Sequence, residues 1–315
     1  MKRTIFACFL SFAGIFYLSQ QSSGAIRSVL QVSANVAAPY VGPIDAVPGA
    51  AVFWGLQAKT AAYATGLGKL ANVCTALDAV CADVSSDASG SFNISAVGSL
   101  ACNNTISICT VKTLYDQVGT ACAGSTVCDV TQATIANRPT LVVPGATNGC
   151  TNVAKPCLQF VAASSQCLFG ANTYTQAQPF SFSVVGQRPT SGAINVTIGF
   201  NTNRFIGWSA TANTTISKWT TTTPQPTATA SDATFHSIQY IVSNTVGSTS
   251  VDGSTTAGVT GTQALANAPI VGSAASNCAT TPLGGFLSQA IIYPSALSSQ
   301  NITDLNANDH SNWGF

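Results

Sequence analysis

Cysteine spacing constrains the fold of this chain more than any other feature of its sequence. Eight of the 11 cysteines form four close pairs, whose members are six or seven residues apart. The pairs are Cys74 and Cys81, Cys102 and Cys109, Cys122 and Cys128, and Cys150 and Cys157. Cys167 and Cys278 remain, together with Cys8 near the N-terminus. An even set of ten is typical of disulfide-bonded exported proteins, so we predict four short bridges and a long one, Cys167–Cys278.

A metal site is the alternative use of these cysteines. The sequence has no Cys-x-x-Cys motif, and His236 and His310 are its two histidines. Zinc sites in proteins are usually built from closely spaced cysteines and histidines, so the chain offers few suitable ligands. We therefore expect no cofactor, with a calcium ion as the alternative that stays open.

The N-terminus has the features of an export signal. Lys2 and Arg3 precede a mostly apolar run from Ile5 to Leu18, and Ser23-Gly24-Ala25 follows. Small residues at that point suit a signal peptidase, so we predict a signal peptide over residues 1–25. An uncleaved anchor is the alternative, but the run is shorter than the roughly 20 residues that a membrane span needs. We expect a mature protein that is secreted or periplasmic and not embedded in a membrane.

Few residues of this chain carry a charge. Charged side chains make up 7% of the sequence, with 11 basic and 10 acidic residues. Since there is no basic stripe, we expect no nucleic acid partner. All ten acidic residues are aspartates, which excludes any mechanism that requires glutamate. A surface of hydroxyl and amide groups suits a glycan or another cell-surface ligand, and it equally suits an inert exported protein.

Short apolar stretches separated by turn residues fill most of the chain. Residues 178–187 alternate strictly, with Phe180, Phe182 and Val184 on one face, and predict a half-buried strand. Residues 69–85 predict a hairpin that brings two cysteines together, and Asp252-Gly253 predicts a type I′ hairpin turn. Further strands are predicted at residues 51–57, 109–117, 138–143, 157–161, 192–200, 204–210, 216–221, 235–243 and 284–294.

Helical signals are few and short. Residues 56–66 predict a helix that ends at Gly66. Residues 295–308 predict a terminal helix capped by Ser298 or Ser299, with Ile302 and Leu305 on its buried face. Many short strands with one terminal helix indicate an all-β fold, either a β-sandwich or a jelly roll. We predict an irregular leader over residues 26–50 and one domain over residues 51–315.

A series of segments carries a family resemblance. In order they are LYDQVG…DVTQATIANRPTLVV (114–143), CLQF (157–160), QPFSFSVVG (178–186), SVDGSTTAGVTGTQAL (250–265) and GGFLSQAIIYPSALSSQNITDLNAN (284–308). Together they resemble the LamG-like, concanavalin A-like jelly roll of bacterial exported and phage-associated proteins. The N-terminal half also resembles the catalytic domain of arabinofuranosidase B-type α-L-arabinofuranosidases. The resemblance covers about residues 51–312 and implies a concanavalin A-like jelly-roll β-sandwich with a short C-terminal helix.

The resemblance implies carbohydrate binding more readily than catalysis. The arabinofuranosidases resemble other retaining glycosidases in using a carboxylate pair that includes glutamate, which this chain lacks. Where LamG-like chains often carry glutamate before the IIYP segment, this chain has Gln289. We assign no catalytic residue and predict a non-catalytic protein that binds carbohydrate or a surface ligand. A glycoside hydrolase and a structural surface or phage-fibre-like module are the alternatives.

Five residues are candidate ligand contacts. Asp116 and Gln117 follow a predicted strand, where they could bind sugar hydroxyls. Asp116 could instead accept N–H bonds from the glycine turn that follows it. Trp208 and Trp219 lie on neighbouring predicted strands with Arg204 nearby, and their rings could stack on sugars or pack in the core.

Other polar residues have weaker support. Asp252 could supply a metal-binding carboxylate, although a turn role fits Asp-Gly better. His236 has no nucleophilic serine motif nearby, and the absence of G-x-S-x-G argues against a serine hydrolase. We expect Trp54 and Trp313 to be packing residues.

Overall fold

The computed structural model describes residues 39–75, 77–98, 100, 102, 108–119, 122, 127–144, 150, 155–190, 192–219, 227–243, 247–258 and 261–315. The chain divides into two units, Met1–Pro39 and Tyr40–Phe315. Residues 1–38 lie outside the described residues, so the signal peptide over 1–25 and most of the leader over 26–50 stay predictions. Within the second unit, residues 43–46 form a helical turn and Val47 is buried.

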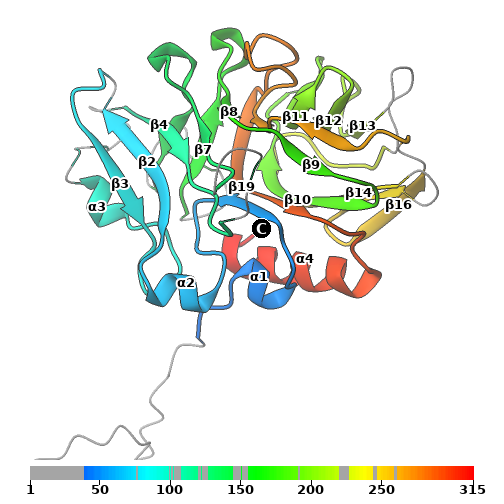
Figure 1. Ribbon diagram of the computed structural model, residues 1–315, viewed down its shortest axis with the longest axis horizontal. Helices are drawn as coiled ribbons and strands as arrows, with labels where there is room; N and C mark the ends of the chain where they lie inside the picture. Colours follow the sequence, from blue (N-terminus) through cyan, green and yellow to red (C-terminus); the bar gives the residue numbers. More distant parts are fainter. Residues whose placement is uncertain are drawn as a thin grey trace, which may run out of the picture. The chain divides into compact units, whose positions relative to one another are not determined.

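Antiparallel strands make up most of the second unit, which confirms the predicted all-β class (Figure 1). The strands before the centre of the chain are β1 (Val52–Gly55), β2 (Lys69–Thr75), β3 (Cys81–Ser85), β4 (Cys109–Leu114), β5 (Val130–Thr131), β6 (Thr140–Val142), β7 (Cys157–Phe160), β8 (Leu168–Gly170) and β9 (Tyr174–Gln176). The later strands are β10 (Phe180–Gln187), β11 (Asn195–Asn201), β12 (Arg204–Trp208), β13 (Thr215–Lys218), β14 (His236–Val242), β15 (Gly247–Val251), β16 (Ser254–Gly258), β17 (Leu265–Asn267), β18 (Ile270–Val271) and β19 (Gly285–Tyr293). The α-helices are α1 (Pro43–Ala46), α2 (Ala61–Thr65), α3 (Ile94–Gly98) and α4 (Ser299–Trp313), with 3-10 turns at Ile135–Asn137 and Ala162–Ser164.

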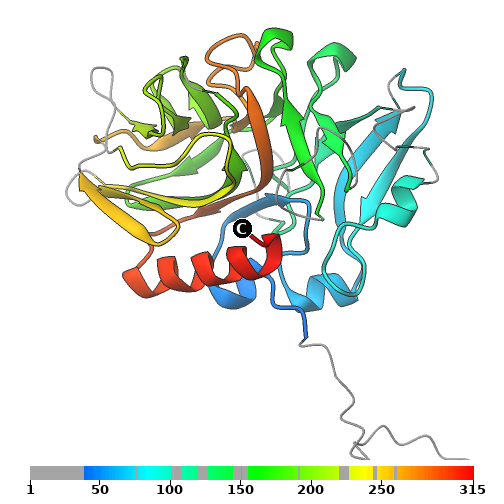
Figure 2. The same cartoon turned by 180° about the vertical axis from the view of Figure 1, so that it is seen from behind.

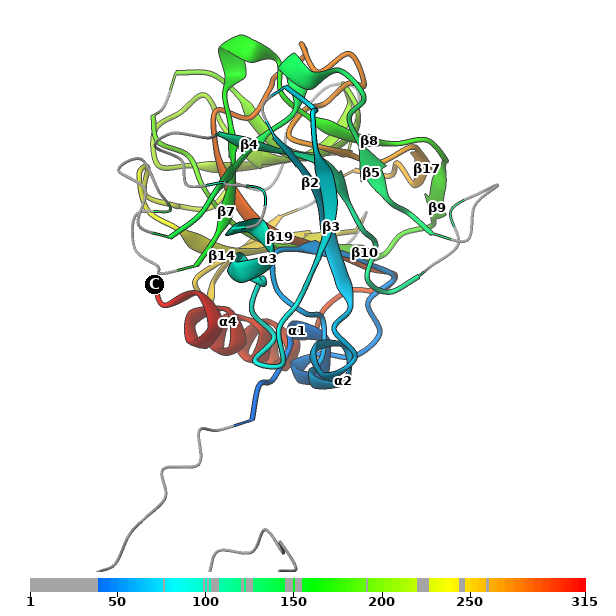
Figure 3. The ribbon, with the colours of Figure 1, turned by 90° about the vertical axis from the view of Figure 1, so that its left-hand side faces the viewer.

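Two antiparallel layers form a β-sandwich. In the first layer, β16, β15, β14, β10, β19 and β1 pair in that order. In the second layer, β13, β12, β11, β18, β8, β5, β4, β2 and β3 pair in that order. Strands β6 and β7 pair between β4 and β19 and so connect the two layers at one end. Figure 3 shows the sandwich from this end, with β2, β3 and β4 toward the viewer.

An aromatic cluster fills the space between the layers. Trp219 stacks on Phe182 with ring centroids 5.5 Å apart and meets Phe180 edge-on at 5.1 Å. Phe200, from β11 in the second layer, lies 6.2 Å from Trp219. These rings are buried, and their hydrophobic contacts hold the layers together.

Helices α1 and α4 cover the outer face of the first layer (Figure 2). Ile302 and Leu305 of α4 pack against Phe53, Ile241 and Ile291 of the sheet. As a result, β10 is buried along its whole length, so the prediction of a half-buried strand over 178–187 is wrong. Period-two alternation marks the face that meets the other sheet, but small serines on the second face are buried under a helix instead of meeting water.

Several local predictions are confirmed. The side chain of Ser298 caps α4 by accepting the N–H of Asn301, and the helix continues to Trp313, beyond the predicted end. Asp252 and Gly253 have φ values of 48° and 83°, which the predicted type I′ turn between β15 and β16 requires. Among the described residues, no helix has the length and apolar character needed to cross a bilayer.

Five disulfides join the cysteines in the pairs that their spacing predicts. The bridges are Cys74–Cys81, Cys102–Cys109, Cys122–Cys128, Cys150–Cys157 and Cys167–Cys278. Cys74 and Cys81 face each other across the β2–β3 hairpin, as expected. The Cys167–Cys278 bridge spans 111 residues and links the start of β8 to the loop after β18.

Candidate functional site

Asp116 lies inside the fold, where its carboxylate anchors the backbone. Its Oδ1 accepts N–H bonds from Phe53 (3.2 Å) and Val118 (3.1 Å). Its Oδ2 lies 3.4 Å from the backbone nitrogen of Cys128. These contacts join the end of β4 to β1 and to the Cys122–Cys128 bridge. Of the two roles considered for Asp116, this geometry corresponds to the backbone cap.

Gln117 is also committed to the backbone. Its Oε1 accepts the N–H of Lys59 at 2.8 Å, and its Nε2 donates to the carbonyls of Gly55 (3.1 Å) and Gln57 (2.9 Å). The residue is 3% exposed. A ligand would have to displace these buried bonds to reach the amide.

The two candidate stacking residues, Trp208 and Trp219, are both completely buried. Trp219 belongs to the aromatic cluster between the layers, so neither ring offers a free face to a sugar as the protein is folded. Trp54 and Trp313 are buried too, as expected of packing residues, and the indole of Trp54 donates to the carbonyl of Cys128 at 2.8 Å.

Arg204 positions an amide at the surface. Its guanidinium donates to the Oδ1 of Asn267 at 3.0 Å and to the Oε1 of Gln263 at 2.8 Å. Asn201 donates to the same Asn267 oxygen at 3.1 Å. Two side chains of the β11–β12 hairpin therefore hold Asn267. Asn201 and Asn267 both line a surface cavity.

Two neighbouring cavities, here called hollow 1 and hollow 2, share Phe169 of β8 as a lining residue. Hollow 1 has a volume of about 370 Å³, and its walls are Cys122, Val127, Cys128, Asp129, Thr131, Ala133, Phe169, Gly170, Ala171 and Asn172. Hollow 2 has a volume of about 290 Å³, and its walls are Phe169, Phe200, Asn201, Thr202, Asn267, Ala268, Ile270, Ala275 and Ser276. Apolar surface with a few amide and hydroxyl groups suits a small neutral ligand.

Asp129 is the ionisable side chain among the described residues that line hollow 1, since the two cysteines there form a disulfide. Its Oδ1 accepts the backbone N–H of Asp116 at 2.8 Å. Burial, together with the charge of Asp116, raises the pKa of Asp129 above its ordinary value, against the opposing effect of this hydrogen bond. The anchored Asp116 thus holds a half-buried carboxyl at the wall of the cavity.

His236 has partners that its sequence neighbourhood does not reveal. Its Nδ1 lies 2.6 Å from the Oδ2 of Asp252, and its Nε2 lies 2.9 Å from the carbonyl and 3.1 Å from the Oγ of Ser231. Burial lowers the pKa of His236, but the hydrogen bond and charge of Asp252 outweigh it, so the net pKa is raised. Because a carbonyl oxygen only accepts, Nε2 must donate to it and cannot serve as a base toward Ser231. The three residues have the composition of a catalytic triad, but their hydrogen bonds join the segments around Ser231 and Asp252 to the start of β14.

A second buried carboxyl, Asp309, lies between α4 and the first layer. It accepts hydrogen bonds from Ser237 Oγ and Gln289 Nε2, both at 2.6 Å. Complete burial raises the pKa of Asp309 to about 7, although these two bonds oppose the shift. Gln289 also accepts bonds from Gln57 (2.6 Å) and Trp313 (3.3 Å), so its amide is part of an internal network.

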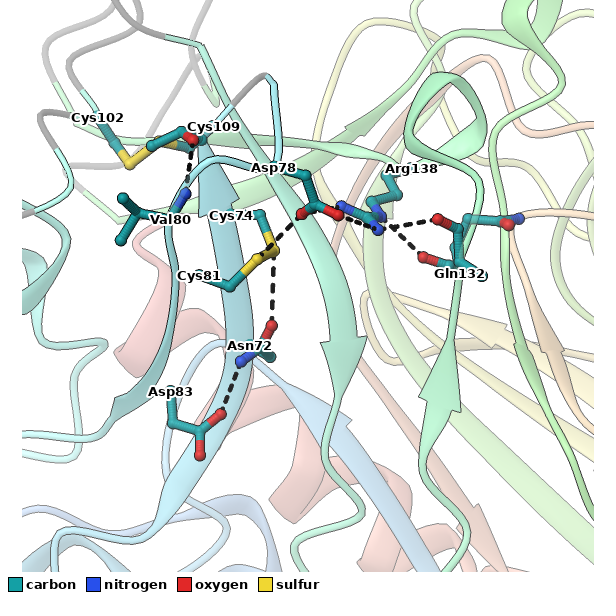
Figure 4. Close-up of a disulfide and its surroundings, with 12 residues drawn as sticks. Asn72, Cys74, Asp78, Val80, Cys81, Asp83, Cys102, Cys109, Gln132 and Arg138 are labelled. Carbon is teal, nitrogen blue, oxygen red and sulfur yellow. Dashed lines mark hydrogen bonds and ion pairs between the residues drawn. A yellow bond between two sulfur atoms is a disulfide. The ribbon is translucent and has the colours of Figure 1, made fainter.

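One group of side chains has the composition of a metal site. Cys74, Asp78 and Cys81 lie within ligand distance of one another. Figure 4 shows that the two sulfurs share a disulfide and that the Asp78 carboxylate faces Arg138, at 2.7 and 3.2 Å. Disulfide sulfurs are not thiolate ligands, and the hydrogen bond from the Arg138 guanidinium lowers the pKa of Asp78. This group is a structural ion pair in the oxidised protein.

The solved structures of other proteins identify the fold. No family model matches the sequence, and no curated protein matches it. A GH54 α-L-arabinofuranosidase has a TM-score of 0.60 as a point mutant soaked with 4-nitrophenyl α-L-arabinofuranoside and 0.59 when soaked with a cyclic sulfate inhibitor. An arabinofuranosidase complexed with arabinofuranosyl-α-1,2-xylobiose has a TM-score of 0.54. Each is 12% identical to this chain, with 85% of this chain and 64% of the other covered.

These neighbours agree with the predicted partial resemblance to arabinofuranosidases at the level of the fold. The chain spans 64% of the length of the structures that it matches. At 12% identity the likeness establishes a shared architecture. What the chain binds has to be argued from its own cavities.

Sequence patterns do not reveal the residues that line hollow 1 and hollow 2. Phe169, Asn201 and Asn267 carry no motif, and they come together only through pairing among β8, β18 and β11. Asp129 has a signal in the sequence, because it directly follows Cys128 and lies within 13 residues of Asp116 in the YDQ segment. Of the five predicted contacts, Arg204 reaches a cavity, through Asn267, and the other four do not line either hollow.

Proposed function

We propose that this protein is an exported, non-catalytic β-sandwich that binds a neutral carbohydrate in hollows 1 and 2. The observation that carries the proposal is the pair of adjoining cavities that share Phe169 and are lined by amide and hydroxyl groups. Sugars present apolar C–H faces and many hydroxyls, which match an aromatic ring flanked by hydrogen-bonding side chains. Five disulfides and the signal-like N-terminus support export to an oxidising compartment.

Arabinose-containing oligosaccharides are the first ligands to test, because the fold neighbours are arabinofuranosidases. Isothermal titration calorimetry with arabino-oligosaccharides and arabinoxylan fragments should show saturable binding. Weak affinity is expected, since Asp129 is the one ionisable group among the described walls of the hollows and few charge-assisted contacts can form.

A matched pair of variants locates the binding site. Phe169→Leu keeps an apolar side chain of somewhat smaller size but removes the aromatic face, so we expect it to weaken binding by about tenfold. Leu77→Ala changes a residue that is 87% exposed in the β2–β3 turn and should leave binding unchanged. Equal affinity of wild type and Phe169→Leu would show that the hollows are not the site.

Hydrolysis is the second candidate function, favoured by the neighbouring enzymes' fold and by the raised pKa of Asp129. Retaining glycosidases need two carboxyl groups about 5 Å apart on either side of the bond. Among the described lining residues, hollow 1 offers one carboxyl, and Asp116 behind it is bonded to the backbone. We expect no release of nitrophenol from 4-nitrophenyl α-L-arabinofuranoside, and release that Asp129→Asn abolishes would establish an enzyme instead.

A further inference from the structure

Hollow 1 differs from hollow 2 in its charge. Asp129 is the ionisable group among the described walls of hollow 1, whereas the described walls of hollow 2 carry amides, hydroxyls and apolar groups. No lysine or arginine is among the described residues that line either cavity. A ligand group that enters hollow 1 therefore meets a carboxylate with no cation from those walls to offset it.

The carboxyl of Asp129 is held in place by the interior of the protein. Asp116 donates its backbone N–H to Asp129 Oδ1 at 2.8 Å, while the Asp116 carboxylate is itself fixed by Phe53 and Val118. The neighbouring residue, Cys128, is tied by its disulfide to Cys122 and by its carbonyl to Trp54. Asp129 therefore has little freedom to swing away from an incoming ligand.

A second negative charge lies behind the first. Asp116 and Asp129 are close enough for the charge of Asp116 to raise the pKa of its neighbour. An anionic ligand in hollow 1 would meet Asp129 at the wall and would also be repelled, from farther away, by the buried Asp116. The space is partly desolvated, so Coulomb repulsion is stronger there than in water. Hydroxyl and ammonium groups, by contrast, can donate hydrogen bonds to the same carboxylate.

We propose that Asp129 makes hollow 1 select its ligand by charge, so that it accepts neutral or amine-bearing sugar units and rejects sugar acids. This inference rests on the proposed function, since it requires that sugars bind in the hollows. Rejection of the wrong ligand by an unpaired like charge is a common way to achieve specificity.

The experiment compares three forms of one arabino-oligosaccharide at pH 7 and low ionic strength. The first is the neutral sugar, the second has its primary hydroxyls oxidised to carboxylates, and the third has them replaced by amines. For the wild type we expect the acid form to bind at least about tenfold more weakly than the neutral form. The amine form should bind as tightly as the neutral form or more tightly.

The Asp129→Asn variant tests the assignment of the charge. Asparagine keeps an oxygen that can accept the N–H of Asp116, so the fold should persist, as circular dichroism will check. We expect the acid form to bind this variant within about threefold of the neutral form. Asp304→Asn, on α4, is the matched control and should retain the wild-type discrimination.

The possible outcomes distinguish a failure of the role of Asp129 from a failure of carbohydrate binding. Equal binding of the acid and neutral forms by the wild type, or unchanged discrimination in Asp129→Asn, overturns the role of Asp129 while leaving carbohydrate binding intact. If the wild type binds none of the three sugars, the proposed function fails and the selectivity with it. Relief of discrimination in Asp129→Asn alone supports the inference.

Discussion

Aspartates have different roles in this chain, and their hydrogen-bond partners decide which. Asp116 accepts backbone N–H groups, Asp78 pairs with Arg138, and Asp309 accepts bonds from a serine hydroxyl and a glutamine amide. Backbone donors and a guanidinium stabilise the charged form of a carboxyl. Two neutral donors in a fully buried site do not outweigh the cost of burying the charge, so the pKa of Asp309 is raised to about 7, whereas the pKa of Asp78 is lowered.

This pKa predicts how stability depends on pH. The pKa of Asp309 rises from an unfolded value of 3.8 to about 7, so the folded state binds the proton more tightly than the unfolded state does. Its contribution is therefore fully present below about pH 4 and is lost as the pH rises through about 7. The raised pKa of His236 acts in the same direction. We expect the melting temperature to fall between pH 5 and pH 8.

The Asp309→Asn variant provides the control for this prediction. An amide can still donate to Ser237 and accept from Gln289, but it does not titrate. Thermal unfolding followed by circular dichroism should show a smaller decrease with pH in the variant. An identical pH profile in wild type and variant would contradict the assignment to Asp309.

Strand β10 is buried on both faces, because the second layer covers one face and the segment leading into α4 covers the other. Its phenylalanines face the second layer and its serines face α4. Ser181 Oγ accepts the N–H of Leu297 at 3.0 Å, at the turn that leads into α4. The small serines thus allow the chain before α4 to approach the sheet closely while hydrogen bonds satisfy their hydroxyls.

The disulfides join elements over very different distances, and their effects on stability should differ accordingly. On the chain-entropy account, the Cys167–Cys278 bridge, which closes a loop of 111 residues, contributes about 5 kcal/mol. The Cys122–Cys128 bridge has a sequence separation of 6 and contributes about 2 kcal/mol. We expect the Cys167→Ala/Cys278→Ala double variant to lose clearly more free energy of unfolding in urea than the Cys122→Ala/Cys128→Ala variant.

Sugar binding provides a further comparison of the two double variants. Sugar binding should weaken in the Cys122→Ala/Cys128→Ala variant, because both cysteines line hollow 1. Equal losses of stability in the two double variants would show that loop length does not govern the effect here.

Across the whole molecule, all four tryptophans of the sequence are at most 1% exposed. Their fluorescence should therefore be resistant to quenching by iodide in the native state and become accessible in urea. Titration with a sugar should leave their emission nearly unchanged, because neither hollow is lined by a tryptophan among the described residues. A large sugar-induced change would instead place the ligand against Trp208 or Trp219, as the sequence analysis considered.

The sequence by itself determined the features that depend on neighbouring residues. Cysteine spacing indicated all five bridges, period-two patterns placed many of the strands, and Asp252-Gly253 and Ser298 set a turn and a helix start. Each of these is encoded within a short segment, because local backbone geometry and loop closure depend on a few adjacent residues.

Only the tertiary structure decided which side chains line a cavity. Burial of both faces of β10, the contact of His236 with Asp252 across 16 residues, and the hollows around Phe169 all arise where distant segments pack together. A segment's own pattern does not specify its packing partners, since these follow from the order of strands in two layers and from the helix that covers one of them. For this reason the sequence left Asp116 open as a ligand contact or a backbone cap, whereas in the structure it bonds to the backbone and Asp129 lines hollow 1.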